Sequence, residues 1–171
     1  MRMEQTFKIF GAYEWYKRDK EKNKNTPVVL KGLVAQVKGR VEKQLEGVSL
    51  KIQYNRLRAT AGSFLLDGIV DRIENSDAVI FDITGFNPNV MFELGVAMQA
   101  ARSTNGAKVY VICEGKEFDR NKIPSDLDGY FVSFYEVSKD GPVFHDVNSL
   151  AMRLVSEVAR KYNAAYTEDE E

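Results

Sequence analysis

One glutamate, Glu93, is the residue of this chain whose type and position most directly suggest chemistry. It is the only charged residue between Asp82 and Arg102, in a stretch that is otherwise apolar or uncharged polar. A carboxylate is costly to bury unless it is paired or hydrogen-bonded. An acidic side chain at an apolar helix start, just after a strand, is therefore a candidate catalytic group. The alternative is a structural carboxylate that bonds to Thr84, Tyr13 or an arginine.

A carboxylate in a partly apolar cleft suits one kind of reaction particularly well, the cleavage of a glycosidic bond. The transition state of that reaction has oxocarbenium character, and a nearby carboxylate attacks the anomeric carbon or stabilises its positive charge. This chemistry requires neither a metal ion nor a cofactor, and we expect none here.

Three polar side chains precede Glu93 at spacings that allow them to share its site. Asp82 ends an apolar run, where it holds a ribose hydroxyl or a water, or else caps the loop that follows. Asn87 precedes Pro88 and suits the N-cap of a helix. Asn89 lies one helical turn before Glu93, so the two side chains can face the same pocket.

The elements that position these residues alternate along the chain between short apolar strands and amphipathic helices. Strands are predicted over 7–12, 49–54, 78–83, 108–113 and 130–135, and helices over 26–45, 60–74, 87–102 and 147–162. Thr26-Pro27 is predicted to cap and start the first of these helices. The order predicts an α/β protein, a flavodoxin-like three-layer sandwich with a five-stranded parallel sheet (order 2-1-3-4-5) and helices on both faces. We expect residues 1–163 to form one domain and residues 164–171 to form an acidic, disordered tail.

In such a fold the residues that follow the strands line one edge of the sheet, where ligands bind. Besides Glu93, the candidates at this edge are Gly11, Tyr13, Arg56, Arg58, Gly62, Ser63, Asp82, Gly85, Asn87 and Asn89. Gly11 and Gly62 allow close backbone approach or positive φ, or serve as ordinary turns. Ser63 suits a phosphate or sugar hydroxyl at a helix start, or a plain N-cap. Arg56 and Arg58 are candidates to hold a phosphate.

Composition and motifs argue against several other classes of protein and site. With one cysteine, Cys113, and one histidine, His145, the chain has no disulfide framework or cysteine-based zinc site, and we discount Ser-His and Cys-His mechanisms. It has neither a GxGxxG nor a Walker A motif. No apolar run is long enough to span a bilayer and no apolar signal region begins the chain, so a cytoplasmic protein without membrane contact is expected.

Charge is distributed unevenly along the chain. Residues 1–58 contain 14 Lys/Arg against 6 Asp/Glu, although the whole chain has a net charge of −1. A solvated helix face with an acidic tail explains this distribution, and so does a basic rim that attracts a phosphorylated ligand. No cluster of basic and aromatic residues indicates a nucleic-acid partner.

The segment from Asp82 to Gly95, Asp-Ile-Thr-Gly-Phe-Asn-Pro-Asn-Val-Met-Phe-Glu-Leu-Gly, resembles the signature of the nucleoside 2-deoxyribosyltransferase family and its TIR-like relatives. In that group an acidic residue ends a strand, and Glu-Leu-Gly follows on a helix. The resemblance implies that Glu93 is the catalytic residue and that Asp82 contacts sugar or base. Transferases often carry an aspartate in the loop before the glutamate, where this chain has Asn87 and Asn89.

The segment Phe-Gly-Ala-Tyr-Glu-Trp at 10–15 looks like the first strand and loop of the transferases. It implies that Tyr13 and Trp15 stack on a base. Because such transferases often complete their sites across subunits, the resemblance also implies a homo-oligomer.

Two classes of function follow. In the first, the chain is a nucleoside 2-deoxyribosyltransferase or a nucleotide or NAD glycohydrolase that cleaves the N-glycosidic bond of a nucleoside, nucleotide or NAD through Glu93. In the second, it is a non-catalytic module, either a nucleotide sensor or a TIR-like interaction domain, in bacterial defence signalling.

Overall fold

Strands and helices alternate in the computed structural model, which describes residues 5–13, 22–44, 50–56, 65–102, 106–115, 123–127, 132–138, 141–145 and 147–168. The strands are β1 (Gln5–Ala12), β2 (Leu50–Arg56), β3 (Ala78–Asp82), β4 (Lys108–Glu114), β5 (Val132–Ser138) and β6 (Gly141–Phe144). The helices are α1 (Lys22–Gln44), α2 (Leu65–Glu74), α3 (Pro88–Ala100) and α4 (Val147–Glu168), with short 3-10 helices η1 (Thr84–Phe86) and η3 (Ser125–Leu127). The predicted α/β class with a parallel sheet is confirmed.

The described strands form one sheet in the order β2-β1-β3-β4-β5-β6. Neighbours from β2 to β5 pair in parallel, and β6 pairs antiparallel with β5. The prediction of five strands omitted β6, because a four-residue segment that begins Gly141-Pro142 has the composition of a turn. Proline is tolerated there because β6 lies at the edge of the sheet.

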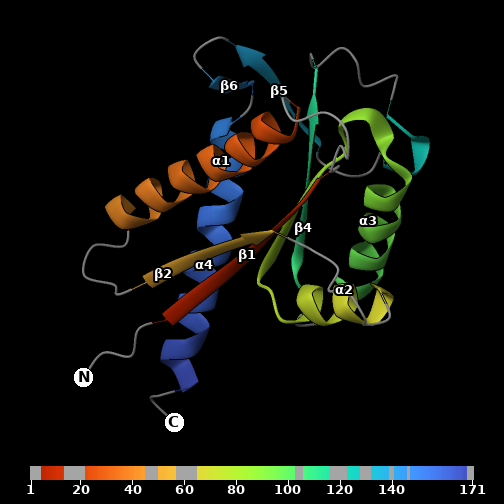
Figure 1. Ribbon diagram of the computed structural model, residues 1–171. Helices are drawn as coiled ribbons and strands as arrows, with labels where there is room; N and C mark the ends of the chain where they lie inside the picture. The colour runs from red at the N-terminus through yellow and green to blue at the C-terminus, as the bar shows by residue number, and fades with distance from the viewer. Residues whose placement is uncertain are drawn as a thin grey trace.

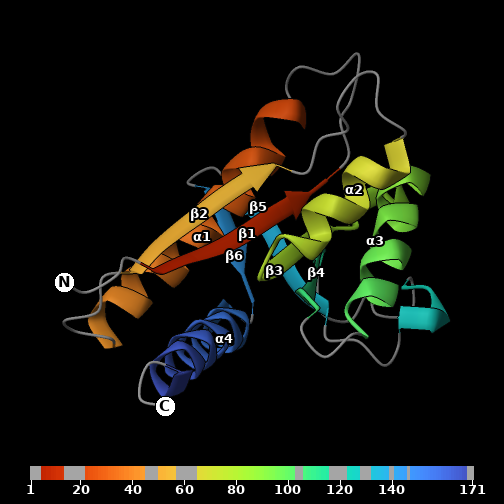
Figure 2. The ribbon, with the colours of Figure 1, turned by 90° about the horizontal axis from the view of Figure 1, so that it is seen from below.

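Helices cover both faces of the sheet, with α1 and α4 on one side and α2 and α3 on the other (Figures 1 and 2). Every residue of β3 is buried, which explains its nearly continuous apolar sequence. Successive residues of this strand point to opposite faces: Ala78 and Ile80 pack in the α1/α4 core, and Val79 and Phe81 in the α2/α3 core. By the same alternation Asp82 lies on the α1/α4 face.

Two helix boundaries differ from the prediction. Helix α1 begins at Lys22 and includes Pro27, whereas the prediction placed its cap at Thr26 and its first residue at Pro27. Residues 22–25 contain no apolar side chain, so hydrophobic periodicity gave no sign of this first turn. Helix α4 extends to Glu168, into the segment assigned to an acidic tail, and the helix-forming pair Ala164-Ala165 accounts for the extension.

Helix α1 contains two glycines that its packing does not require. A Cβ built on Gly32 or Gly39 has no heavy atom within 4 Å. Because glycine in a helix interior costs about 0.5–1 kcal/mol relative to alanine, Gly32→Ala and Gly39→Ala are each expected to stabilise the protein by about that amount. Urea unfolding measures the change, and a loss of stability would show that these positions are crowded.

Candidate functional site

The connection from β3 to α3 holds the residues that the sequence singles out, and its backbone is tightly specified. Asn87 caps α3, because its side-chain oxygen accepts hydrogen bonds from the backbone N–H groups of Asn89 (2.9 Å) and Val90 (3.4 Å). The predicted cap is therefore confirmed, and Pro88 occupies the first turn, where its missing N–H is harmless. The start of α3, and with it the position of Glu93 along the sheet edge, is set by this cap.

The turn before this cap has an unusual backbone. Gly85 and Phe86 both have positive φ, 74° and 51°. Glycine adopts this conformation freely, whereas for phenylalanine it is strained. Phe86 is held there by packing against the α2/α3 core and by the hydrogen bond from its N–H to the Ile83 carbonyl (2.9 Å). Strained backbone of this kind is concentrated at functional sites.

Asp82 lies at the carboxyl end of β3 and is only 2% exposed. Its Oδ1 accepts hydrogen bonds from the N–H (3.0 Å) and the hydroxyl (2.6 Å) of Thr84, and its Oδ2 accepts one from the hydroxyl of Tyr135 (2.6 Å). Both carboxylate oxygens are thus used inside the protein. The geometry favours the capping alternative for Asp82 over direct contact with a sugar or a base.

The electrostatics of Asp82 reflect its burial. Loss of solvation raises the pKa of this carboxyl, the hydrogen bonds from Thr84 and Tyr135 lower it, and the negative charge of Glu114 raises it again. Burial raises the pKa of the Tyr135 phenol as well, and the neighbouring Asp82 charge raises it further. The phenol therefore stays protonated at neutral pH and donates to Asp82.

The sequence pattern does not identify Tyr135 as a site residue. It presents Thr84 only as a possible hydrogen-bond partner of Glu93. The Thr84 hydroxyl accepts a hydrogen bond from the N–H of Glu114 (2.8 Å), and Tyr135 reaches Asp82 from β5. One signal was present in the sequence: a tyrosine in an apolar strand needs a partner for its hydroxyl. The strand order that would identify this partner is not visible in the sequence.

Glu93 lies in the second turn of α3 and is half-buried. The buried stripe of this helix consists of Val90, Leu94 and Ala97. Glu93 precedes Val96 by three residues, which places the two on one side of the helix. Val96 lines a groove with Val70 of α2, so this side of α3 faces α2. Glu93 is therefore partly exposed to solvent and lies on the side of α3 that faces α2.

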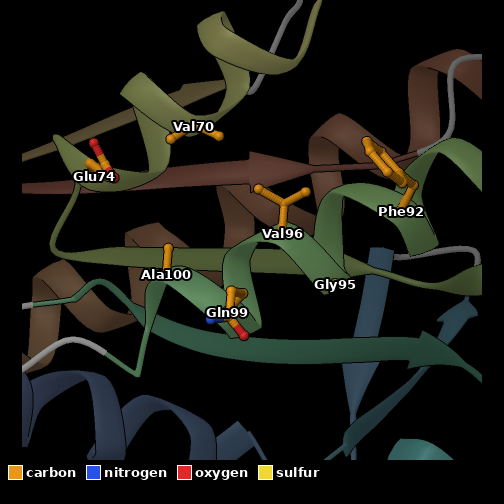
Figure 3. A pocket seen from close by; sticks show the side chains of 7 residues that line it. All are labelled: Val70, Glu74, Phe92, Gly95, Val96, Gln99 and Ala100. Carbon is orange, nitrogen blue, oxygen red and sulfur yellow. The ribbon is translucent and has the colours of Figure 1, made fainter.

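The groove between α2 and α3 is a separate feature from the predicted site (Figure 3). It has a volume of about 550 Å³ and a mainly apolar lining, in which Phe92 is 59% exposed. The lining residues are Val70, Glu74, Phe92, Gly95, Val96, Gln99 and Ala100. Glu93 is not among them, so this groove does not serve as the pocket that its predicted role requires.

The carboxyl ends of β1 and β3 are neighbours in the sheet and lead to helices on opposite faces, α1 and α3. In parallel α/β sheets this arrangement opens a crevice at the sheet edge where ligands bind. Tyr13 follows β1, is partly buried and packs against the α1/α4 core. On the other side, Ala12 shares the α2/α3 core with Val90 and Leu94, so the end of β1 and the start of α3 pack against the same core.

The remaining predicted site residues fall into three groups. Gly11 is buried within the extended strand β1 and pairs with Arg56, the last residue of β2, so positive φ is excluded for Gly11. Gly85 is exposed in the β3–α3 connection, and Asn89 is exposed in the first turn of α3. Trp15, Arg58, Gly62 and Ser63 lie outside the described residues.

Two features are absent from the described part of the chain. No group of three or more His, Cys, Asp or Glu side chains there is arranged to bind a metal ion. No helix there combines the length and apolar character that crossing a membrane requires.

Comparison with known proteins adds no assignment to this geometry. No protein-family model matches the chain, and no curated protein matches it significantly.

Proposed function

We propose that the chain is an N-glycosidase of flavodoxin-like fold, in which Glu93 stabilises or attacks the anomeric carbon of a nucleotide, a nucleoside or NAD at the sheet edge beyond the carboxyl ends of β1 and β3. The observation that carries the proposal is the half-buried Glu93 in the second turn of α3, a helix that packs against the same core as the end of β1. The resemblance of residues 82–95 to the deoxyribosyltransferase and TIR-like signature supports the same role.

The charges around the sheet edge suit a transition state with positive charge. Glu114 ends β4 and is exposed, and Glu93 follows on α3. Carboxylates in and near a partly dehydrated site stabilise an oxocarbenium-like sugar more strongly than water does. In this mechanism Glu93 acts at the sugar, whereas Asp82 acts indirectly, through the backbone turn that it holds.

The loop before Glu93 bears on the choice of leaving group. Asn87 uses its side-chain oxygen to cap α3, and neither Asn87 nor Asn89 can donate a proton as a general acid. A purine or pyrimidine leaving group requires protonation, whereas the nicotinamide of NAD carries a positive charge and departs as a neutral molecule. We therefore favour NAD: the C1′–N bond breaks, its electron pair moves to nicotinamide, and water adds to C1′ and releases a proton.

The test is an incubation of the purified protein with NAD and with matched ribonucleotides and 2′-deoxynucleosides, with chromatography of the released bases. We expect free nicotinamide and ADP-ribose from NAD. Transfer to an added acceptor base would instead indicate a deoxyribosyltransferase. A thermal shift with ligand but no turnover of any compound would contradict the enzyme proposal and favour a nucleotide sensor.

A further inference from the structure

We infer that Tyr135 is a positioning residue for Glu93, acting through Asp82 and the turn that starts α3. The inference rests on the proposed function for its effect on catalysis. The hydrogen bonds that carry it are present whatever the reaction is.

Tyr135 belongs to β5 and reaches across β4 to the end of β3. It is 2% exposed, and its hydroxyl lies 2.6 Å from Asp82 Oδ2 and 3.4 Å from Thr84 Oγ1. The sheet order places β4 between these two strands. A single phenol therefore ties β5 to the β3–α3 connection through a short, buried hydrogen bond.

Thr84 connects Asp82 to the turn at residues 84–87. Its hydroxyl donates to Asp82 Oδ1 and accepts from the N–H of Glu114, and its own N–H also donates to Asp82. Gly85 and Phe86 follow in their left-handed conformation, and Asn87 then caps α3. From Tyr135 to the helix cap, each link is a hydrogen bond or a short stretch of constrained backbone.

The position of Glu93 depends on this series of contacts. It stands six residues beyond the capping Asn87, on a helix whose first turn is fixed by that cap. Because a misplacement of about 1 Å in a catalytic group costs about 10²-fold in rate, loosening the turn should lower catalysis without removing any group that touches the substrate.

The test compares two conservative substitutions that each remove one buried phenol oxygen. Tyr135→Phe removes the link to Asp82. Tyr110→Phe is the matched control, because Tyr110 is 9% exposed and packs in the same α1/α4 core but lies toward the amino end of β4. We expect Tyr135→Phe to lower kcat by about 10- to 100-fold with KM changed less than about twofold, and Tyr110→Phe to leave both near wild type.

A second pair of variants examines Thr84. Thr84→Val keeps the shape of the side chain and removes its hydroxyl, whereas Thr84→Ser keeps the hydroxyl. We expect Thr84→Val to reproduce the loss of kcat, and Thr84→Ser to retain most of the activity. An equal loss in both variants would overturn the assignment, because the hydroxyl would then not be the group that matters.

A readout without substrate separates this inference from the proposed function. Amide hydrogen exchange over 84–93 should be about tenfold faster in Tyr135→Phe than in wild type or Tyr110→Phe. If wild type releases no base from any compound, the proposed function fails, and the exchange result still decides whether Tyr135 holds the turn. Wild-type exchange in Tyr135→Phe, or equal acceleration in Tyr110→Phe, would overturn the inference.

Discussion

Glu93→Gln is expected to reduce base release by about 10³-fold or more while the protein remains folded. Glutamine has nearly the same shape as glutamate but has no negative charge, and its amide is a poor nucleophile. It therefore removes the group that opposes the positive charge at C1′. Because the loss concerns the transition state, we expect it mainly in kcat and only weakly in the affinity for NAD.

Glu74→Gln is the matched control for this experiment. Glu74 is an exposed glutamate at the end of α2, the helix beside α3, and it lies just before the amino end of β3, at the opposite edge of the sheet from the proposed site. The substitution changes the net charge by the same amount as Glu93→Gln. Equal activity in all three proteins would mean that Glu93 is structural, and equal loss in both variants would point to a general effect of charge.

The parts of the fold that were predictable are those whose sequence depends on local burial. The strand β3 is buried throughout, and its four consecutive apolar residues before Asp82 indicated this. Asn87-Pro88 identified the start of α3 correctly, because an N-cap and a first-turn proline act within one turn of the chain. The strand β6 was not predictable, since its partner β5, rather than its own composition, makes it a strand.

The candidate site was only partly predictable, for a related reason. Asp82 was recognisable as a polar residue at the end of an apolar strand, but its partner Tyr135 is 53 residues away in the sequence. That contact depends on β5 lying two strands from β3, which is a property of the whole sheet. The hydrogen bonds to both carboxylate oxygens are visible only in three dimensions, and they favour the turn-capping alternative for Asp82 over contact with a ribose hydroxyl.

Removing the Asp82 carboxylate should have the largest effect on stability. Asp82→Leu leaves the N–H and hydroxyl of Thr84 and the hydroxyl of Tyr135 without their buried acceptor. Each buried polar group left unsatisfied costs about 1–3 kcal/mol, so we expect a loss of about 2–4 kcal/mol after partial relaxation. Asp82→Asn should cost less, because its amide can accept from Thr84 and donate to the Tyr135 oxygen.

The same pair of proteins gives a dependence on pH whose direction follows from burial. Since burial raises the pKa of Asp82 in the folded state, this carboxyl binds its proton more tightly in the folded protein than in the unfolded chain. The stability contributed by that proton is present below the unfolded pKa and is lost as pH rises through the folded pKa. Asp82→Asn has no such group, so the stability of wild type relative to Asp82→Asn should fall as pH rises from about 4.

Urea unfolding of wild type and Asp82→Asn at a series of pH values measures this difference, and the contributions of all other carboxylates cancel in the comparison. A constant difference across the series would show that Asp82 titrates in the folded protein as it does in the unfolded chain. A difference that grows in favour of wild type would mean that the hydrogen bonds from Thr84 and Tyr135 outweigh the cost of burial. Either result would measure the balance between the burial of Asp82 and its hydrogen bonds from Thr84 and Tyr135.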